Sequence, residues 1–229
     1  MRSRYLLFAI FLFHLDTSSF SQAILKPNYG LKSHETLSIN KIVTDDQNTT
    51  FYMTIENRIA GGNFCADRNI YVIYPDGKKS KLINSSGIPV CPDTYNFKSI
   101  GEKLDFKLEF AAIKSGTKWV DIIEDCNENC FSICGVTLDT TLNREIDEAY
   151  AKAASLKAND AIKYFKAVLD KTGRENLGSE GMLYLNIISL SKEAGDESGA
   201  KEWYRKLQSS GCPRLSQYVK YLNDKGIKY

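Results

Sequence analysis

The stretch FSICGVTLDTTLNREIDEAYAKAA, residues 131–154, contains the point at which the spacing of the apolar residues changes. Residues 131–138 are typical of a β-strand, whereas Ile146, Ala149 and Ala153 recur at the spacing of one helix face. A period of two indicates a half-buried strand, and a period near 3.6 indicates an amphipathic helix. The sequence therefore predicts two architectures end to end, with strands before this point and helices after it.

The N-terminal part, residues 24–139, is expected to be an antiparallel β-sandwich. Residues 104–110 alternate apolar and charged side chains, as a strand does when one face is buried and the other is in water. Many short strands separated by turns predict two packed sheets of immunoglobulin-like architecture. The likeness stops at architecture, because no Trp lies between Cys65 and Cys91, where antibody domains have one. The seven predicted strands are residues 35–43, 51–56, 69–74, 79–84, 104–110, 117–123 and 131–138.

The C-terminal part, residues 140–229, is expected to hold about five short helices in antiparallel hairpins, beginning near Asn143. Residues 182–190 are apolar almost all round, which is typical of a helix buried between other helices. Glycines stand where each helix should end, at positions 173, 195, 211 and 226. The whole chain is therefore predicted to be an α+β protein of two domains.

The helical hairpins resemble tetratricopeptide repeats. Residues 181–196, with Gly195-Asp196 as the turn, look like the second half of a repeat, and residues 161–168 look like the second helix of the repeat before it. Ala161 and Ala200 occupy the small-residue positions at which the two helices of a repeat pack closely. The resemblance implies a groove that could accept a peptide.

The sequence departs from the repeat pattern in two respects. Ile188 and Leu207 stand where the family usually has Gly and Ala. The matching helices are also too far apart for a period of about 34 residues, so extra residues are expected between 171 and 179. A plain helical bundle is the alternative. With segments 63–69 and 89–92 of the β domain, the chain is similar to uncharacterised secreted bacterial proteins that join such a sandwich to such repeats, which implies no activity.

Residues 1–23 have the pattern of a signal peptide. Arg2 and Arg4 precede an apolar run over residues 5–15, and Ser21-Gln22-Ala23 offers small residues for cleavage before Ile24. The run is too short for a membrane span, which needs about 20 apolar residues. The mature chain is therefore expected to be exported, either secreted or periplasmic, with no membrane span of its own.

Export changes the interpretation of the six cysteines, because an oxidising compartment favours disulfides. Cys65 and Cys91 stand in two long loops that need anchoring, and Cys126 and Cys130 flank a polar turn, so we predict these two pairs. The remaining two cysteines, Cys134 and Cys212, are expected to be buried thiols, with a disulfide bond between them that joins the two domains as the alternative. A metal site is not expected, since the cysteines lack C-x2-C spacing and a neighbouring His.

The residues offer little for catalysis. His34 is the one histidine left after signal removal, and we expect it in a solvated loop before the first strand. Acidic neighbours at 45–46 and 124–128 are expected to be solvated turns, although a carboxylate-based hydrolase would need such groups. A net charge of +2 argues against a nucleic-acid binder. No catalytic residue, cofactor or metal is predicted, and the protein is not expected to be an enzyme.

What remains is surface for binding. The long segments 60–68 and 85–103 carry Phe64, Tyr95 and Phe97, which either form a binding surface or pack under their own loops. The sequence therefore predicts an exported, non-catalytic protein that binds or scaffolds another protein or peptide through its sandwich loops and helices. The alternatives are the hydrolase and a purely structural component of the cell envelope.

Overall fold

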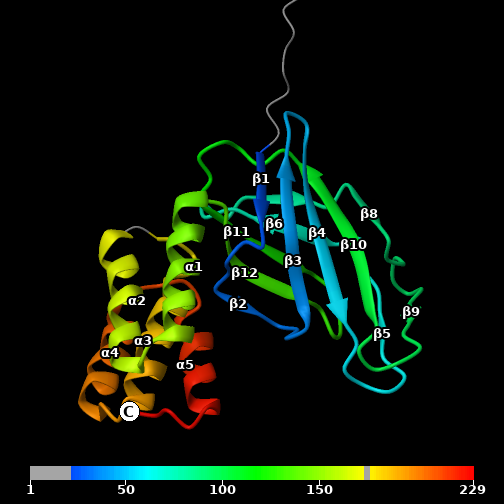
Figure 1. Cartoon of the computed structure of the whole chain (residues 1–229). Helices are drawn as coiled ribbons and strands as arrows, with labels where there is room; N and C mark the ends of the chain where they lie inside the picture. The colour runs from blue at the N-terminus through cyan, green and yellow to red at the C-terminus, as the bar shows by residue number, and fades with distance from the viewer. Residues whose placement is uncertain (1–21, 173–175) are drawn as a thin grey trace, which may run out of the picture.

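Two five-stranded antiparallel sheets are followed by five α-helices in the computed structural model, which describes residues 22–172 and 176–229 (Figure 1). This confirms the predicted α+β class, with strands in the N-terminal part and helices in the C-terminal part. Most of the predicted signal peptide, residues 1–23, lies outside the described residues. Within the described ranges, no helix combines the length and the apolar character that crossing a membrane requires.

The first sheet has the strand order β1-β3-β4-β10-β8, and its long central strands carry the predicted alternation. In β10, buried Leu104, Phe106, Leu108 and Phe110 alternate with more exposed polar residues. The ring of Phe110 meets that of Phe51 on β4 edge to face at 5.6 Å inside the sandwich. The strands are β1 (Gln22–Leu25), β3 (Leu37–Thr44), β4 (Asn48–Glu56), β8 (Asn84–Ser86) and β10 (Lys103–Ala111).

The second sheet has the order β2-β12-β11-β6-β7 and lies between the first sheet and the helices (Figure 1). Its central strand β11 is buried at almost every position, because one face meets the sandwich core and the other meets the helical part. A short two-stranded pair, β5 (Asn63–Phe64) with β9 (Tyr95–Asn96), completes the β part. The second-sheet strands are β2 (Leu31–Lys32), β6 (Ile70–Ile73), β7 (Lys79–Lys81), β11 (Trp119–Glu124) and β12 (Ser132–Thr137).

The segment predicted as one strand over residues 79–84 is divided between the two sheets. Strand β7 pairs with β6 in the second sheet, whereas β8 pairs with β10 in the first. Leu82 N donates to Ile70 O and the next amide, Ile83 N, donates to Glu109 O, each at 2.8 Å. The chain therefore crosses from one sheet to the other here. Side-chain periodicity does not reveal such a crossing, because both halves remain extended.

The five helices begin at Thr140, three residues before the expected start. Asp139 is the reason, since its carboxylate accepts from Thr141 N and Leu142 N as an N-cap. The predicted turn at Gly195-Asp196 is present: Gly195 has φ +76°, and Asp196 caps the next helix by accepting from Gly199 N at 2.8 Å. The helices are α1 (Thr140–Ser155), α2 (Ala158–Thr172), α3 (Glu180–Glu193), α4 (Glu197–Ser209) and α5 (Leu215–Asp224).

Helix α3 is the centre of the helical part, as its apolar sequence predicts. It packs against α2, α4 and α5, and seven of its residues are buried. Helices α1 and α5 lie nearest the sandwich, while α2 and α4 lie on the far side (Figure 1). The small residues Ala161 and Ala200 are fully buried, as close helix packing requires.

Both predicted disulfides are confirmed. Cys65 is bonded to Cys91, and Cys126 to Cys130. The other two cysteines, Cys134 and Cys212, are buried thiols. Disulfides of this kind persist in oxidising compartments, so they are compatible with export.

One contact between the two parts of the chain is made by the loop between α2 and α3. Trp119 Nε1, on β11, donates to Asn176 O at 2.9 Å, and a Cβ added at Gly178 would lie 2.4 Å from Trp119 Cδ2. The extra residues expected between 171 and 179 therefore include those that fasten the helices to the sandwich.

Replacing Gly178 with Ala should cost more stability than the same change at Gly195. Both glycines have positive φ, so each variant loses about 1 kcal/mol to backbone strain. Only Gly178 also meets a ring, which adds about 1–3 kcal/mol of overpacking, whereas nothing lies within 4 Å of a Cβ at Gly195. Equal losses for the two variants in urea unfolding would contradict this packing.

The cysteine states predict a thiol count. In native, unreduced protein, neither Cys134 nor Cys212 should be alkylated at neutral pH. Both thiols are buried, and burial raises the pKa of Cys134 to about 11. Unfolded, unreduced protein should expose two thiols per chain, and mass spectrometry would detect four if a disulfide were absent.

Removal of either disulfide should lower the free energy of unfolding. In the chain-entropy model, the Cys65→Ser/Cys91→Ser variant should lose about 3–4 kcal/mol of this free energy, and the Cys126→Ser/Cys130→Ser variant about 2 kcal/mol.

Candidate functional site

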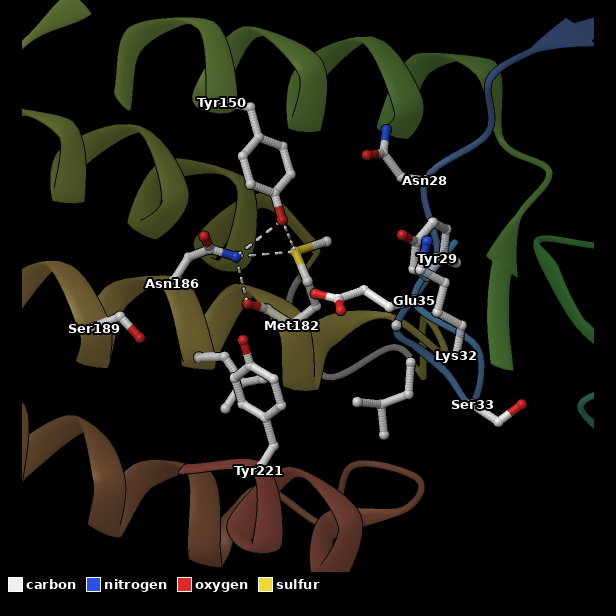
Figure 2. A pocket seen from close by; sticks show the side chains of 13 residues that line it. Asn28, Tyr29, Lys32, Ser33, Glu35, Tyr150, Met182, Asn186, Ser189 and Tyr221 are labelled. Carbon is white, nitrogen blue, oxygen red and sulfur yellow. Dashed lines mark hydrogen bonds between the residues drawn. The ribbon is translucent and has the colours of Figure 1, made fainter. Parts of the chain in front are cut away.

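A pocket of about 640 Å³ lies where the sandwich meets the helices. One wall is the irregular segment around β2, residues 28–35, and the opposite wall is made by side chains of α1, α3 and α5 (Figure 2). Pockets at the junction of two structural units are frequent binding sites, because side chains from distant parts of the chain converge there. We take this pocket as the candidate functional site.

The segment that forms the sandwich-side wall is fixed by hydrogen bonds at its start and its middle. Asn28 N donates to Asn143 Oδ1 at 2.7 Å, and Asn28 Nδ2 donates to Asp147 Oδ1 at 3.0 Å, both on α1. Gly30 N donates to Cys134 O at 2.8 Å, after which β2 pairs with β12. The wall is therefore held to both parts of the molecule.

The helix-side wall carries a small polar network. Tyr150 Oη, from α1, donates to the sulfur of Met182 at 2.9 Å and accepts from Asn186 Nδ2 at 3.0 Å. Asn186 Nδ2 also donates to Met182 O at 2.8 Å, within α3. Figure 2 shows these three side chains meeting at one side of the pocket. The network holds the first and third helices in register.

Three tyrosines from three elements surround the pocket. They are Tyr29 of the sandwich-side wall, Tyr150 of α1 and Tyr221 of α5 (Figure 2). Burial raises the pKa of Tyr150 above its usual value, and the neighbouring phenols of Tyr29 and Tyr221 raise it further. The Tyr150 phenol therefore stays neutral at physiological pH, and the three tyrosines offer aromatic faces and hydroxyl groups to one pocket.

Two charged side chains line the same pocket. Figure 2 shows the carboxylate of Glu35 pointing into it. Lys32 Nζ instead donates to Leu37 O at 2.9 Å and lies 5.2 Å from the centre of the Tyr29 ring. The ammonium group is thus engaged by the chain itself, while the carboxylate faces the open volume.

The three aromatic residues proposed as a binding surface lie elsewhere, against the sandwich core. Phe97 is buried, and Tyr95 packs on it with ring centres 5.2 Å apart. Phe64 is half-buried and contacts the rings of Phe106 and Phe131, each at 6.1 Å. The structure brings these three together under their own loops, which was the alternative that the sequence left open.

His34 lies in the loop between β2 and β3, as expected, but it is less exposed than a solvated loop residue. It is half-buried, its Nδ1 lies 2.9 Å from Ser33 Oγ, and its ring meets the edge of Phe64 at 6.0 Å. Burial lowers the pKa of His34, so the ring is neutral at physiological pH.

The acidic residues at 124–128 were expected in a solvated turn, and one of them, Glu124, is buried instead. Its two carboxylate oxygens accept from Asp67 N at 2.7 Å and Phe131 N at 2.9 Å. Burial raises the pKa of Glu124, but both oxygens hold backbone amides of neighbouring loops. Asp45 has its pKa lowered by the amides of Asn48 and Gln47 in the turn before β4. Both carboxylates therefore have structural partners.

Sequence reasoning missed the pocket. Its two walls come from segments more than a hundred positions apart in the sequence. The one feature that could have indicated the pocket is the set of tyrosines and polar side chains that α1, α3 and α5 contribute to it. Within residues 22–172 and 176–229, no group of three or more His, Cys, Asp or Glu side chains could hold a metal. Comparison of the chain with protein-family models, curated proteins and solved structures gives no match.

Replacing Asn143 with Ala should loosen the sandwich-side wall. Asn143 Oδ1 accepts from Asn28 N, and Asn143 Nδ2 donates to Thr137 O at 2.9 Å, so the variant leaves two backbone groups unpaired. We expect a loss of about 2–3 kcal/mol and faster amide hydrogen exchange over residues 28–35.

Asn40→Ala is the control, because Asn40 is exposed on β3 and its side chain donates to the side chain of Thr54, away from residues 28–35. It should leave exchange at residues 28–35 unchanged. If Asn143→Ala also leaves that exchange unchanged, Asn143 does not fix the wall.

Proposed function

We propose that this protein is exported and works by binding, without catalysis, an extended segment of another protein in the pocket between the sandwich and the helices. One observation carries the proposal: a preformed pocket at this junction is lined by side chains of three alternate helices, α1, α3 and α5, and by a fixed wall from the sandwich. Its side chains are aromatic, hydroxyl and amide groups, which are the groups that recognise peptides in many protein interfaces.

The resemblances in the sequence support the same function. In the tetratricopeptide family the first helices of successive hairpins face a common groove, and here α1, α3 and α5 provide the pocket side chains while α2 and α4 lie outside (Figure 1). We infer that the helices form a short repeat-like array and that the sandwich, of immunoglobulin-like architecture, closes one side of its groove. The signal pattern and the two disulfides support export.

A steric block tests this function. Ser189 is an exposed residue of α3 in the pocket wall, so Ser189→Trp should fill the pocket without removing a core contact. Peptides selected from a random displayed library on the wild-type exported chain should bind the variant about tenfold or more weakly.

Ser209→Trp is the matched control, since Ser209 is exposed on α4, away from the pocket. It should bind the selected peptides as the wild type does, and thermal unfolding should show both variants folded. If no peptide is selected, or if Ser189→Trp binds all of them unchanged, the proposed function is wrong.

A further inference from the structure

The side chains that line the pocket have already used most of their fixed hydrogen-bond donors. Asn28 Nδ2 donates to Asn143 and Asp147, and Asn186 Nδ2 donates to Met182 and Tyr150. The hydroxyl of Tyr150 points its hydrogen at the Met182 sulfur. A ligand therefore meets few free N–H groups on these walls.

Acceptors, by contrast, remain available. In the part of the chain that the structure describes, neither Asn28 Oδ1 nor Asn186 Oδ1 accepts a hydrogen bond, and the Glu35 carboxylate has no ion-pair partner. Each carboxylate oxygen can accept from more than one donor, and each amide oxygen from two. The pocket thus offers free acceptors but few free side-chain N–H donors, which suits a ligand that carries several N–H groups.

The aromatic walls also favour positive charge. The chain's own lysines already lie over two of the three phenol rings, Lys32 Nζ at 5.2 Å from the Tyr29 ring centre and Lys225 Nζ at 5.7 Å from that of Tyr221. A cation over such a ring is attracted by the negative face of the π system. Tyr29, Tyr150 and Tyr221 line the pocket into which Glu35 points (Figure 2).

The charges around the pocket agree with this preference. Glu35 lines it, and Asp147 lies beside it, where its carboxylate holds Asn28. Lys32 is the one cation among the lining residues that the structure describes, and its ammonium is turned to Leu37 O. An anionic ligand would face an unpaired carboxylate at the centre of the pocket, whereas a cationic ligand would pair with it.

We propose that the pocket recognises a cationic side chain, arginine or lysine, of the bound segment, with Glu35 as its counter-ion and the three tyrosines as its walls. This inference rests on the proposed function and names the chemistry of its ligand. A volume of about 640 Å³ exceeds one side chain, so the residues next to the basic one have room within the same pocket.

An isosteric pair of probes tests the charge requirement. N-acetyl-arginine amide and N-acetyl-citrulline amide have nearly the same shape, but only the first is charged. Titrated into the isotopically labelled exported chain, the arginine probe should shift the amide NMR signals of residues 28–35 and 182–189. It should bind about tenfold more tightly than the citrulline probe and lose this advantage at high salt.

Glu35→Gln should reduce the affinity for the arginine probe to that for the citrulline probe. Glu202→Gln is the matched control, because Glu202 is an exposed acid of α4 that pairs with Lys206 at 2.7 Å, and it should leave both affinities unchanged. The proposal is overturned if the two probes bind equally, if neither shifts these signals, or if Glu35→Gln binds the arginine probe as the wild type does.

The two proposals fail in different ways. Peptides that depend on the open pocket but lack Arg and Lys would overturn the charge inference and leave the proposed function standing. Basic peptides that bind Ser189→Trp as well as they bind the wild type would overturn the proposed function, because their binding would not need the pocket.

Discussion

An ion pair between buried Asp121 and half-buried Arg214 joins the two parts of this molecule and holds the helices against the second sheet. Asp121, on β11, is 3% exposed, and its other carboxylate oxygen accepts from Gly135 N at 2.7 Å. A carboxylate in such a place is costly unless a cation and hydrogen bonds compensate for its lost hydration. The start of α5 must therefore lie where Arg214 reaches the sandwich, and this fixes one end of the helical part.

Close backbone contact fixes the rest of the junction. The Tyr218 ring, at the first turn of α5, lies against Gly181 and Gly30, where an added Cβ would be 2.1 Å from Cε2 and 2.2 Å from Oη. Gly135 approaches Gly178 O so closely that an added Cβ would lie 2.1 Å away. Contacts this close are possible only because glycine has no Cβ, and they leave the helices no space to slide over the second sheet. The walls of the pocket are therefore set before any ligand binds, which reduces the entropy cost of binding.

The aromatic residues divide their roles according to where they stand. Those in the long loops of the sandwich, such as Phe64 and Phe97, pack in or against its core. Those on the inward faces of the helices, such as Tyr150 and Tyr221, remain 39% and 45% exposed and line the pocket. The loops therefore stabilise the β part, and the helices supply the groups that a ligand would meet. This distribution supports the proposal that binding takes place at the junction.

Local patterns in the sequence were enough to predict the change from strands to helices, the alternating strands, the turn at Gly195-Asp196 and both disulfide pairs. Each of these features depends on residues close together in the chain or on the composition of the loops. They could not reveal that residues 79–84 are shared between two sheets, since an extended segment keeps one period whichever sheet it joins. Nor could they reveal the pocket. Asn28 and Asn143 are 115 positions apart, and Asp121 and Arg214 are 93 apart. Such pairs form only when the helices dock on the second sheet. The charged and polar groups buried there need hydrogen-bond partners, and these partners come from distant parts of the chain that no local pattern can indicate.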